Sequence, residues 1–235
     1  MTAKEILAEM RPLGSAGYKQ VMLNHGAKEP FFGVKISDLQ KIVKRIRQDY
    51  ALALELYATG NYDAMYLAGL IADDARMTKP DLTRWVSKAY CKGLYGSTVP
   101  WVAAGSPHGW ELALAWIDSK TPQTAAAGWG TLGSLVAIKD DAELDLAELK
   151  RLLQRVVKTI QQAPDPVRSQ MNLFVIGVGC YVKPLSALAV QTGDAIGPVT
   201  VDVGHTACQV PFAPDYIRKV EQRGTLGKKR KSAKC

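Results

Sequence analysis

The stretch DLAELKRLLQRVVKTI, residues 145–160, indicates the fold class, because its apolar residues recur at helical spacing. These residues are Leu146, Leu149, Leu152, Leu153, Val156, Val157 and Ile160. Asp145 is suited to cap the start of a helix, and Pro164 ends the pattern because proline lacks a backbone N–H. The stretch is therefore predicted to be an amphipathic helix.

The same periodicity continues on both sides of this stretch. ISDLQKIVKRIRQD, residues 36–49, repeats it with Ser37 or Asp38 as the cap. Further helices are expected at residues 51–59, 63–72, 81–92, 108–118, 123–139, 166–182, 185–195 and 214–223. Consecutive helices joined by short turns are typical of stacked helix pairs, so the sequence predicts an all-α solenoid. Residues 197–211, rich in β-branched and turn-forming residues, are expected to form an ordered loop with one short extended piece.

Length and composition favour one soluble domain over residues 1–223. The chain has 235 residues, of which 47% are apolar, enough for a full core. The first ten residues, MTAKEILAEM, carry acidic residues and no apolar leader, so we expect a cytoplasmic protein that does not bind membranes. Four scattered cysteines (Cys91, Cys180, Cys208 and Cys235) show no metal-ligand spacing and are expected to be reduced thiols. Neither a metal nor a cofactor is expected.

The net charge of +8 is concentrated at the C-terminus. Lys228, Lys229, Arg230, Lys231 and Lys234 contribute five of these charges. Residues 224–235 are predicted to be a disordered basic tail, because this composition cannot bury apolar surface. Such a tail is either a solvated terminus or a non-specific phosphate-binding arm.

Two helices carry rows of basic residues away from the apolar stripe. Lys41, Lys44 and Arg45 are neighbours on the first, with Lys35 just before it, and Arg151, Arg155 and Lys158 form the row on the second. Such rows are either solvated faces or, if a solenoid aligns them along one concave groove, a surface that follows DNA phosphates.

Five tryptophans lie between residues 85 and 129. Trp85 and Trp116 suit a helical core. Trp101, in a turn, and Trp129, among small residues, are better placed to line a cleft, where a flat ring can stack on a base. No local catalytic signature accompanies them, and the three histidines are isolated from one another.

Three segments carry a resemblance to a known family: EPFFGVKISDLQKIVKRI, GNYDAMYLAGLIADDARMT with DLTRWV, and VTVDVGHTACQVPFAPDYIRK. In this order they resemble DNA alkylation repair proteins of the AlkD-like kind. The resemblance implies a right-handed superhelix of HEAT-like helix pairs, armadillo-like in shape, whose basic concave face holds double-stranded DNA, alkylated or distorted. It implies activity without a metal, and the chain is expected to be a monomer.

Active members of that family are glycosylases that release alkylated purines with an aspartate near mid-chain, aromatic side chains and an arginine on a following helix. A carboxylate suits this chemistry because it stabilises the positive charge that develops at C1′. Here residues 82–110 contain no Asp or Glu, and no arginine occurs between Arg84 and Arg151. Glu111 is the nearest carboxylate after the gap.

The sequence therefore predicts a DNA-binding member of the alkylation repair family whose glycosylase activity is lost or altered. One alternative is an active glycosylase that uses an unusual residue such as Glu111. Another is a helical scaffold that binds protein and has no role with nucleic acid.

Overall fold

The protein is described by a computed structural model, which covers residues 1–202 and 209–234. This part of the chain forms thirteen α-helices and contains no strand. They are α1 (Ala3–Met10), α2 (Ala16–Asn24), α3 (Ile36–Ile46), α4 (Tyr50–Ala58), α5 (Tyr62–Ile71), α6 (Lys79–Lys88), α7 (Val99–Gly105), α8 (Gly109–Trp116), α9 (Pro122–Ile138), α10 (Leu146–Thr159), α11 (Asp165–Tyr181), α12 (Ser186–Ile196) and α13 (Ala213–Gln222).

Each helix expected from periodicity is present, and the all-α prediction is confirmed. Three further helices, α1, α2 and α7, were not predicted. α1 begins with a capping box in which Thr2 and Glu5 satisfy each other's backbone N–H groups. α7 contains Trp101, which the sequence places in a turn. Pro100 lies in the first turn of this helix, where proline removes no hydrogen bond.

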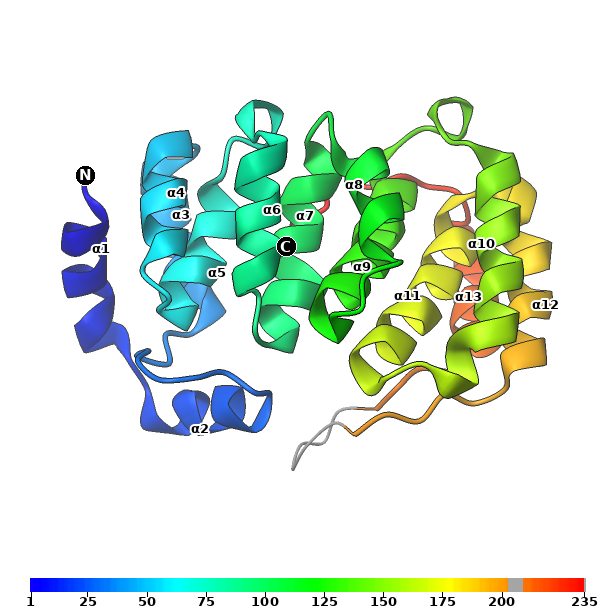
Figure 1. Cartoon of the computed structure of the whole chain (residues 1–235), viewed down its shortest axis with the longest axis horizontal. Coiled ribbons are helices and arrows are strands. Elements are labelled where there is room, and N and C mark those ends of the chain that lie inside the picture. Colours follow the sequence, from blue (N-terminus) through cyan, green and yellow to red (C-terminus); the bar gives the residue numbers. More distant parts are fainter. Residues whose placement is uncertain (203–208, 235) are drawn as a thin grey trace.

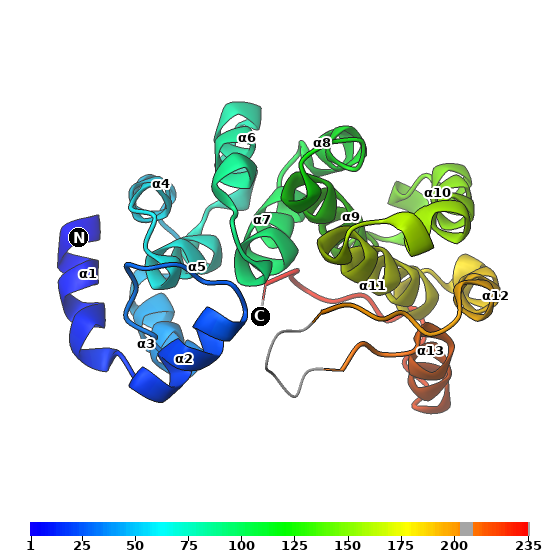
Figure 2. The ribbon, with the colours of Figure 1, turned by 60° about the horizontal axis from the view of Figure 1, so that its bottom comes forward.

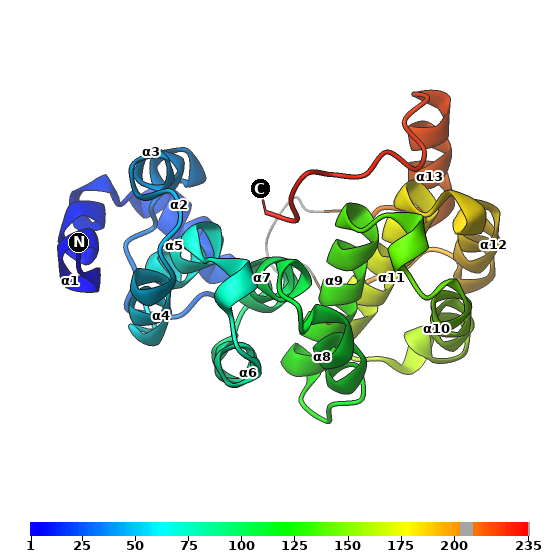
Figure 3. The same cartoon turned by 90° about the horizontal axis from the view of Figure 1, so that it is seen from above.

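The helices form a curved array of two layers (Figure 1). α4, α6, α8, α10 and α12 make an outer row, while α5, α7, α9 and α11 make an inner row (Figure 2). Seen from above, α3 and α13 rise at opposite ends of the inner row (Figure 3). The side of the inner row that these two helices flank is called the concave face below.

The core divides into two apolar clusters, one in each half of the array. Met65, Leu82 and Trp85 belong to the N-terminal cluster. Leu152 and Phe174 belong to the C-terminal one. Aromatic rings pack closely in both halves: Tyr57 and Trp85 stack with their centroids 4.0 Å apart, for example. Burial of one face of each helix therefore holds the array together.

Buried carboxylates hold loops to the helices. Asp63 in α5 is 1% exposed and accepts hydrogen bonds from three consecutive backbone N–H groups, those of Phe32, Gly33 and Val34, at 2.7, 3.0 and 3.1 Å. Gly33 adopts a φ of +78°, and a Cβ there would lie 2.6 Å from the Cβ of Lys19. Only glycine fits this close approach.

The C-terminal tail differs from the expectation of disorder. Residues 224–234 run from α13 back across the array (Figure 3), and Ala233 is 4% exposed. Lys229 pairs with Asp141 at 2.8 Å and Lys234 with Asp74 at 2.7 Å. The tail has no apolar run of its own. Ion pairs with carboxylates of the folded array, which lie far earlier in the sequence, hold it in place instead.

The remaining expectations about segments are met only in part. Residues 197–202 and 209–211 of the expected loop form no regular structure, and its centre, with His205 and Cys208, lies outside the described residues, as does Cys235. Cys91 and Cys180 are buried free thiols. In the described part of the chain no single helix is long and apolar enough to cross a membrane, although α11 and Lys183–Ile196 pass that test together as a pair bent by 115°.

Candidate nucleic-acid interface

The first predicted basic row lies on α3, which borders the concave face (Figure 3). Lys35, Lys41, Lys44 and Arg45 are all exposed. Lys41 pairs with Asp38 at 2.8 Å, and Arg45 donates to Glu9 of α1 at 3.0 Å. Lys35 and Lys44 add further positive charge beside them. Exposed ion pairs of this kind contribute little to folding, so these side chains remain available to phosphates.

The second row lies on α10 in the outer row. Arg151 donates to Glu148 at 2.7 Å, Arg155 pairs with Asp118 at 2.7 Å, and Lys158 is exposed. α3 and α10 lie at opposite ends of the array and on opposite sides of the inner row (Figures 1 and 3). The expectation that one concave groove aligns both rows is therefore wrong, because α10 packs on the convex side.

The two tryptophans expected in a cleft lie in the core. Trp129 in α9 is fully buried, with its ring centroid 5.3 Å from that of Phe174, and the guanidinium of Arg155 covers its ring at 5.8 Å. Trp101 in α7 is 8% exposed and packs edge-on against Tyr66. Neither ring is free to stack on a base. The small residues around Trp129 let helices pack close to it, and this packing buries it.

The inner row has no carboxylate where the resemblance places one. Residues 82–110 contribute the end of α6, a π-helical turn (Leu94–Thr98), α7 and the start of α8. α7 presents only apolar residues and a glycine, VPWVAAG. Of the two hydroxyls just before it, that of Thr98 is buried and donates to the Gly93 carbonyl at 3.1 Å.

Glu111 lies on α8 in the outer row and pairs with Lys79 at 2.6 Å. The hydrogen bond and charge of that lysine lower the pKa of Glu111. A well-solvated carboxylate with a lowered pKa on the convex side is a surface ion pair. Its position offers no support for a catalytic role.

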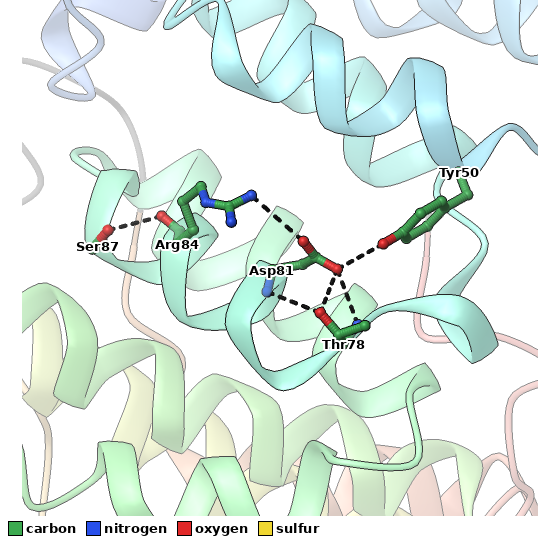
Figure 4. A network of polar contacts seen from close by, with 5 residues as sticks. All are labelled: Tyr50, Thr78, Asp81, Arg84 and Ser87. Atoms are coloured by element: carbon green, nitrogen blue, oxygen red, sulfur yellow. Dashed lines mark hydrogen bonds and ion pairs between the residues drawn. The ribbon is translucent and has the colours of Figure 1, made fainter.

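Asp81 of α6 is the centre of a polar network on the outer row (Figure 4). Its Oδ2 accepts hydrogen bonds from the Tyr50 hydroxyl at 2.8 Å and from the Thr78 backbone N–H at 3.2 Å. Its Oδ1 lies 3.5 Å from the Arg84 guanidinium. Although burial alone would raise it, these partners together lower the pKa of Asp81. Asp81 therefore caps α6 and joins it to α4.

A small polar cavity that sequence reasoning missed lies where α11 begins. It has a volume of about 80 Å³ and is lined by Lys92, Tyr95, Asp165 and Gln170, among others. Burial, helped by the nearby Cys91 and Asp165, raises the pKa of Tyr95 to about 12. Asp165 Oδ2 accepts the Asp202 N–H at 2.7 Å, which ties residues 197–202 to α11. No local pattern joins these residues; only the stacking of helices does.

The layered helix pairs define a HEAT-like repeat array, the class of fold that this chain shares with a similar solved structure. A family model described as DNA alkylation repair enzyme matches residues 6–174. The chain belongs to this family.

Similar proteins cover the chain end to end. A solved structure, described as a new family of proteins related to the HEAT-like repeat DNA glycosylases with affinity for branched DNA structures, is 34% identical, covers 100% of both chains and superposes with a TM-score of 0.90. Uncharacterized protein Lin0241 of Listeria innocua is 29% identical over 229 residues, and Uncharacterized protein Lmo0209 of Listeria monocytogenes is 28% identical over 230. Each alignment covers 95% of this chain and 99% of the relative.

Proposed function

We propose that this protein binds branched or distorted DNA through its concave face and does not excise alkylated purines. The observation that carries the proposal is the absence of any Asp or Glu from residues 82–110 in a chain whose fold matches that of its solved relative over its whole length. The affinity of its solved structural relative for branched DNA supports the choice of ligand.

The chemistry of excision explains why the absence of a carboxylate from residues 82–110 matters. A departing alkylpurine leaves positive charge on the sugar, and a preorganised carboxylate stabilises it by several kcal/mol. The apolar side chains of α7 cannot replace that charge, and the hydroxyl of Thr98 is already hydrogen-bonded inside the protein. Asp165 holds a loop and Glu111 lies on the outer row, so neither is placed as a substitute.

Binding is tested by titrating a labelled four-way junction and a duplex of the same sequence at several salt concentrations. We expect tighter binding to the junction and a steep decrease of affinity with salt, because phosphate contacts release counterions. Equal affinities for the two DNAs would contradict the preference for branched DNA. Absence of binding to both would favour a protein-binding scaffold.

Excision is tested on methylated duplex DNA by measuring released N3-methyladenine and N7-methylguanine. We expect release within a few-fold of the spontaneous rate, because aromatic and dipolar contacts accelerate departure only slightly when no carboxylate is present. Robust multiple-turnover release that Glu111→Gln or Asp165→Asn abolishes would show an active glycosylase with unusual residues instead.

A further inference from the structure

Two inner helices end in the same short sequence pattern. Ile71-Ala72-Asp73-Asp74-Ala75 closes α5, and Ile138-Lys139-Asp140-Asp141-Ala142 closes α9. In both, the second aspartate begins a 3₁₀ turn, Asp74–Arg76 or Asp141–Glu143. The chain therefore builds two similar acidic turns at the C-terminal ends of two parallel members of the inner row.

Each turn receives one lysine from the C-terminal tail. Lys234 Nζ lies 2.7 Å from Asp74 Oδ1 and donates to the Ala72 carbonyl at 2.7 Å. Lys229 Nζ lies 2.8 Å from Asp141 Oδ1 and donates to the Val136 carbonyl at 3.0 Å. Both lysine side chains are 15% exposed. Within the described residues, the lysine ammonium is the sole partner of each of these two buried carboxylate oxygens.

Backbone contacts fix the tail before the first lysine and between the two lysines. The N–H of Gly227 donates to the Cys180 carbonyl in the last turn of α11 at 2.8 Å. The N–H of Arg230 donates to the Ala137 carbonyl in the last turn of α9 at 2.8 Å. The tail therefore lies across the C-terminal ends of α11, α9 and α5 in turn, on the concave side (Figure 3).

The C-terminal end of a helix carries a partial negative charge on its unpaired carbonyls. A row of such ends, with Asp74 and Asp141 beside them, repels phosphate. The docked tail reverses that charge, because it brings five cations and no acid. Two of the cations neutralise the aspartates, and the other three, Lys228, Arg230 and Lys231, remain exposed.

The docked tail also borders an open pocket of about 280 Å³ against α11 and α13. Tyr181, Tyr216, Lys228 and Arg230 are among the residues that line it, and Tyr216 is 48% exposed. Tyrosine beside lysine and arginine is the combination that stacks on bases and binds the phosphodiester backbone of nucleic acids.

We propose that the C-terminal tail is a docked part of the DNA-binding surface, in which Lys229 and Lys234 are anchors and Lys228, Arg230 and Lys231 contact DNA phosphates. This inference rests on the proposed function in DNA binding. A tail that inhibits DNA binding by occupying a cationic site is acidic, because it takes the place of the polyanion. This tail is basic and covers negative helix ends, so it adds to the site rather than masking it.

The test distinguishes the effect of tail docking on DNA binding from the effect of the tail's positive charge. Asp74→Asn/Asp141→Asn removes the anchoring carboxylates and leaves every tail cation in place, while raising the net charge by two. Lys228→Gln/Arg230→Gln/Lys231→Gln removes the presented cations and keeps the anchors. Both variants and the unaltered chain are titrated with the four-way junction, and hydrogen exchange at the amides of Gly227 and Arg230 reports docking.

The anchor variant is expected to lose amide protection and to bind about threefold to tenfold more weakly despite its added positive charge, because the presented cations are no longer preorganised. The triple variant is expected to keep protection and to lower the salt slope by about 1 for each lost cation. Matched controls on the convex side are Glu111→Gln/Asp118→Asn for the first variant and Lys150→Gln/Arg151→Gln/Lys158→Gln for the second. Both controls are expected to bind like the unaltered chain.

Tighter binding by the anchor variant would overturn the proposal and identify the tail as an inhibitory strap. Unchanged binding by the triple variant, or unprotected amides in the unaltered chain, would also overturn it. If the unaltered chain binds no DNA, the proposed function itself fails, and this inference fails with it.

Discussion

Asp63 is buried in α5, and its carboxylate oxygens accept hydrogen bonds from the backbone N–H groups of Phe32, Gly33 and Val34. Burial raises the pKa of Asp63, and the three N–H groups partly offset that effect. A carboxylate that already accepts three hydrogen bonds has little capacity left for a substrate. Its role is to hold the segment before α3 against the inner row.

Asp63→Asn tests this role. The amide keeps one accepting oxygen and brings an NH₂ group against donors, so at least one buried N–H loses its partner. We expect the free energy of unfolding to decrease by roughly 3 kcal/mol, measured by urea denaturation. Asp118→Asn, which changes an exposed carboxylate, is the control and is expected to change stability little. Equal stabilities for the two variants would show that other contacts hold the segment before α3.

Asp74 makes docking of the tail dependent on pH. Burial raises its pKa to about 6, against the opposing effect of Lys234, while the neighbouring Asp73 adds a small increase. Because Lys234 pairs with the ionised form, this ion pair is expected to be lost as pH falls through about 6. The contribution of Asp74 itself to folding runs the other way: it is present below the ordinary pKa of 3.8 and is lost as pH rises through about 6.

Chemical shifts of the Ala233 and Lys234 amides across a pH titration measure this transition. A midpoint near 6 in the unaltered chain and its disappearance in Asp74→Asn are the expected results. A flat titration in both proteins would mean that the ion pair does not hold the end of the tail.

At the scale of the elements, α3 and α10 have similar amphipathic sequences but different positions. Both bury an apolar stripe and expose a basic row. α3 borders the concave face, whereas α10 packs beside α12 in the outer row (Figures 2 and 3). The same local pattern is therefore expected to have a functional role on one helix and none on the other.

Lys41→Ala/Arg45→Ala is expected to weaken junction binding and to lower the salt slope by about 2. Arg151→Ala/Arg155→Ala is expected to leave both unchanged. Thermal unfolding of each variant controls for loss of fold, because Arg155 also covers Trp129 and pairs with Asp118. If the α10 variant weakens binding as much as the α3 variant, DNA contacts extend over the convex side.

At the scale of the whole molecule, the tail joins the two halves of the array. Ala233 packs in the N-terminal apolar cluster and Leu226 against the C-terminal one. The anchors of Lys234 and Lys229 lie in the corresponding halves. The tail therefore bridges the helix stack on its concave side and ties helices that do not follow one another in sequence.

Deleting residues 228–235 is expected to lower the free energy of unfolding by about 2 kcal/mol, because buried hydrogen bonds and ion pairs are lost. It is also expected to weaken binding to duplex and junction by the same factor, since phosphate contacts carry no sequence information. Calorimetry and the two titrations measure these effects. Unchanged stability would mean that the tail does not stabilise the contact between the two halves of the array. An altered preference between the two DNAs would give the tail a role in shape recognition.

Local residue patterns predict the helical fold, similarity to known members predicts the family, and the sequence shows directly that residues 82–110 lack a carboxylate. The helices follow from local spacing, because an apolar stripe of period 3.6 specifies a helix wherever it occurs. The family follows instead from the resemblance of three segments to known members. Local patterns do not predict α7, whose segment around Trp101 is expected to be a turn, or the short helices α1 and α2.

The packing of distant segments determines which exposed charges face the concave side, why Trp129 is buried and why the basic tail is docked. Each of these depends on which residues from distant parts of the chain cover a given face. A row of cations has the same pattern on α3 and on α10. A lysine-rich tail likewise has the same composition whether or not the folded array provides carboxylates on which it can dock. Burial and pairing are properties of the packed array, because they come from contacts between residues far apart in sequence.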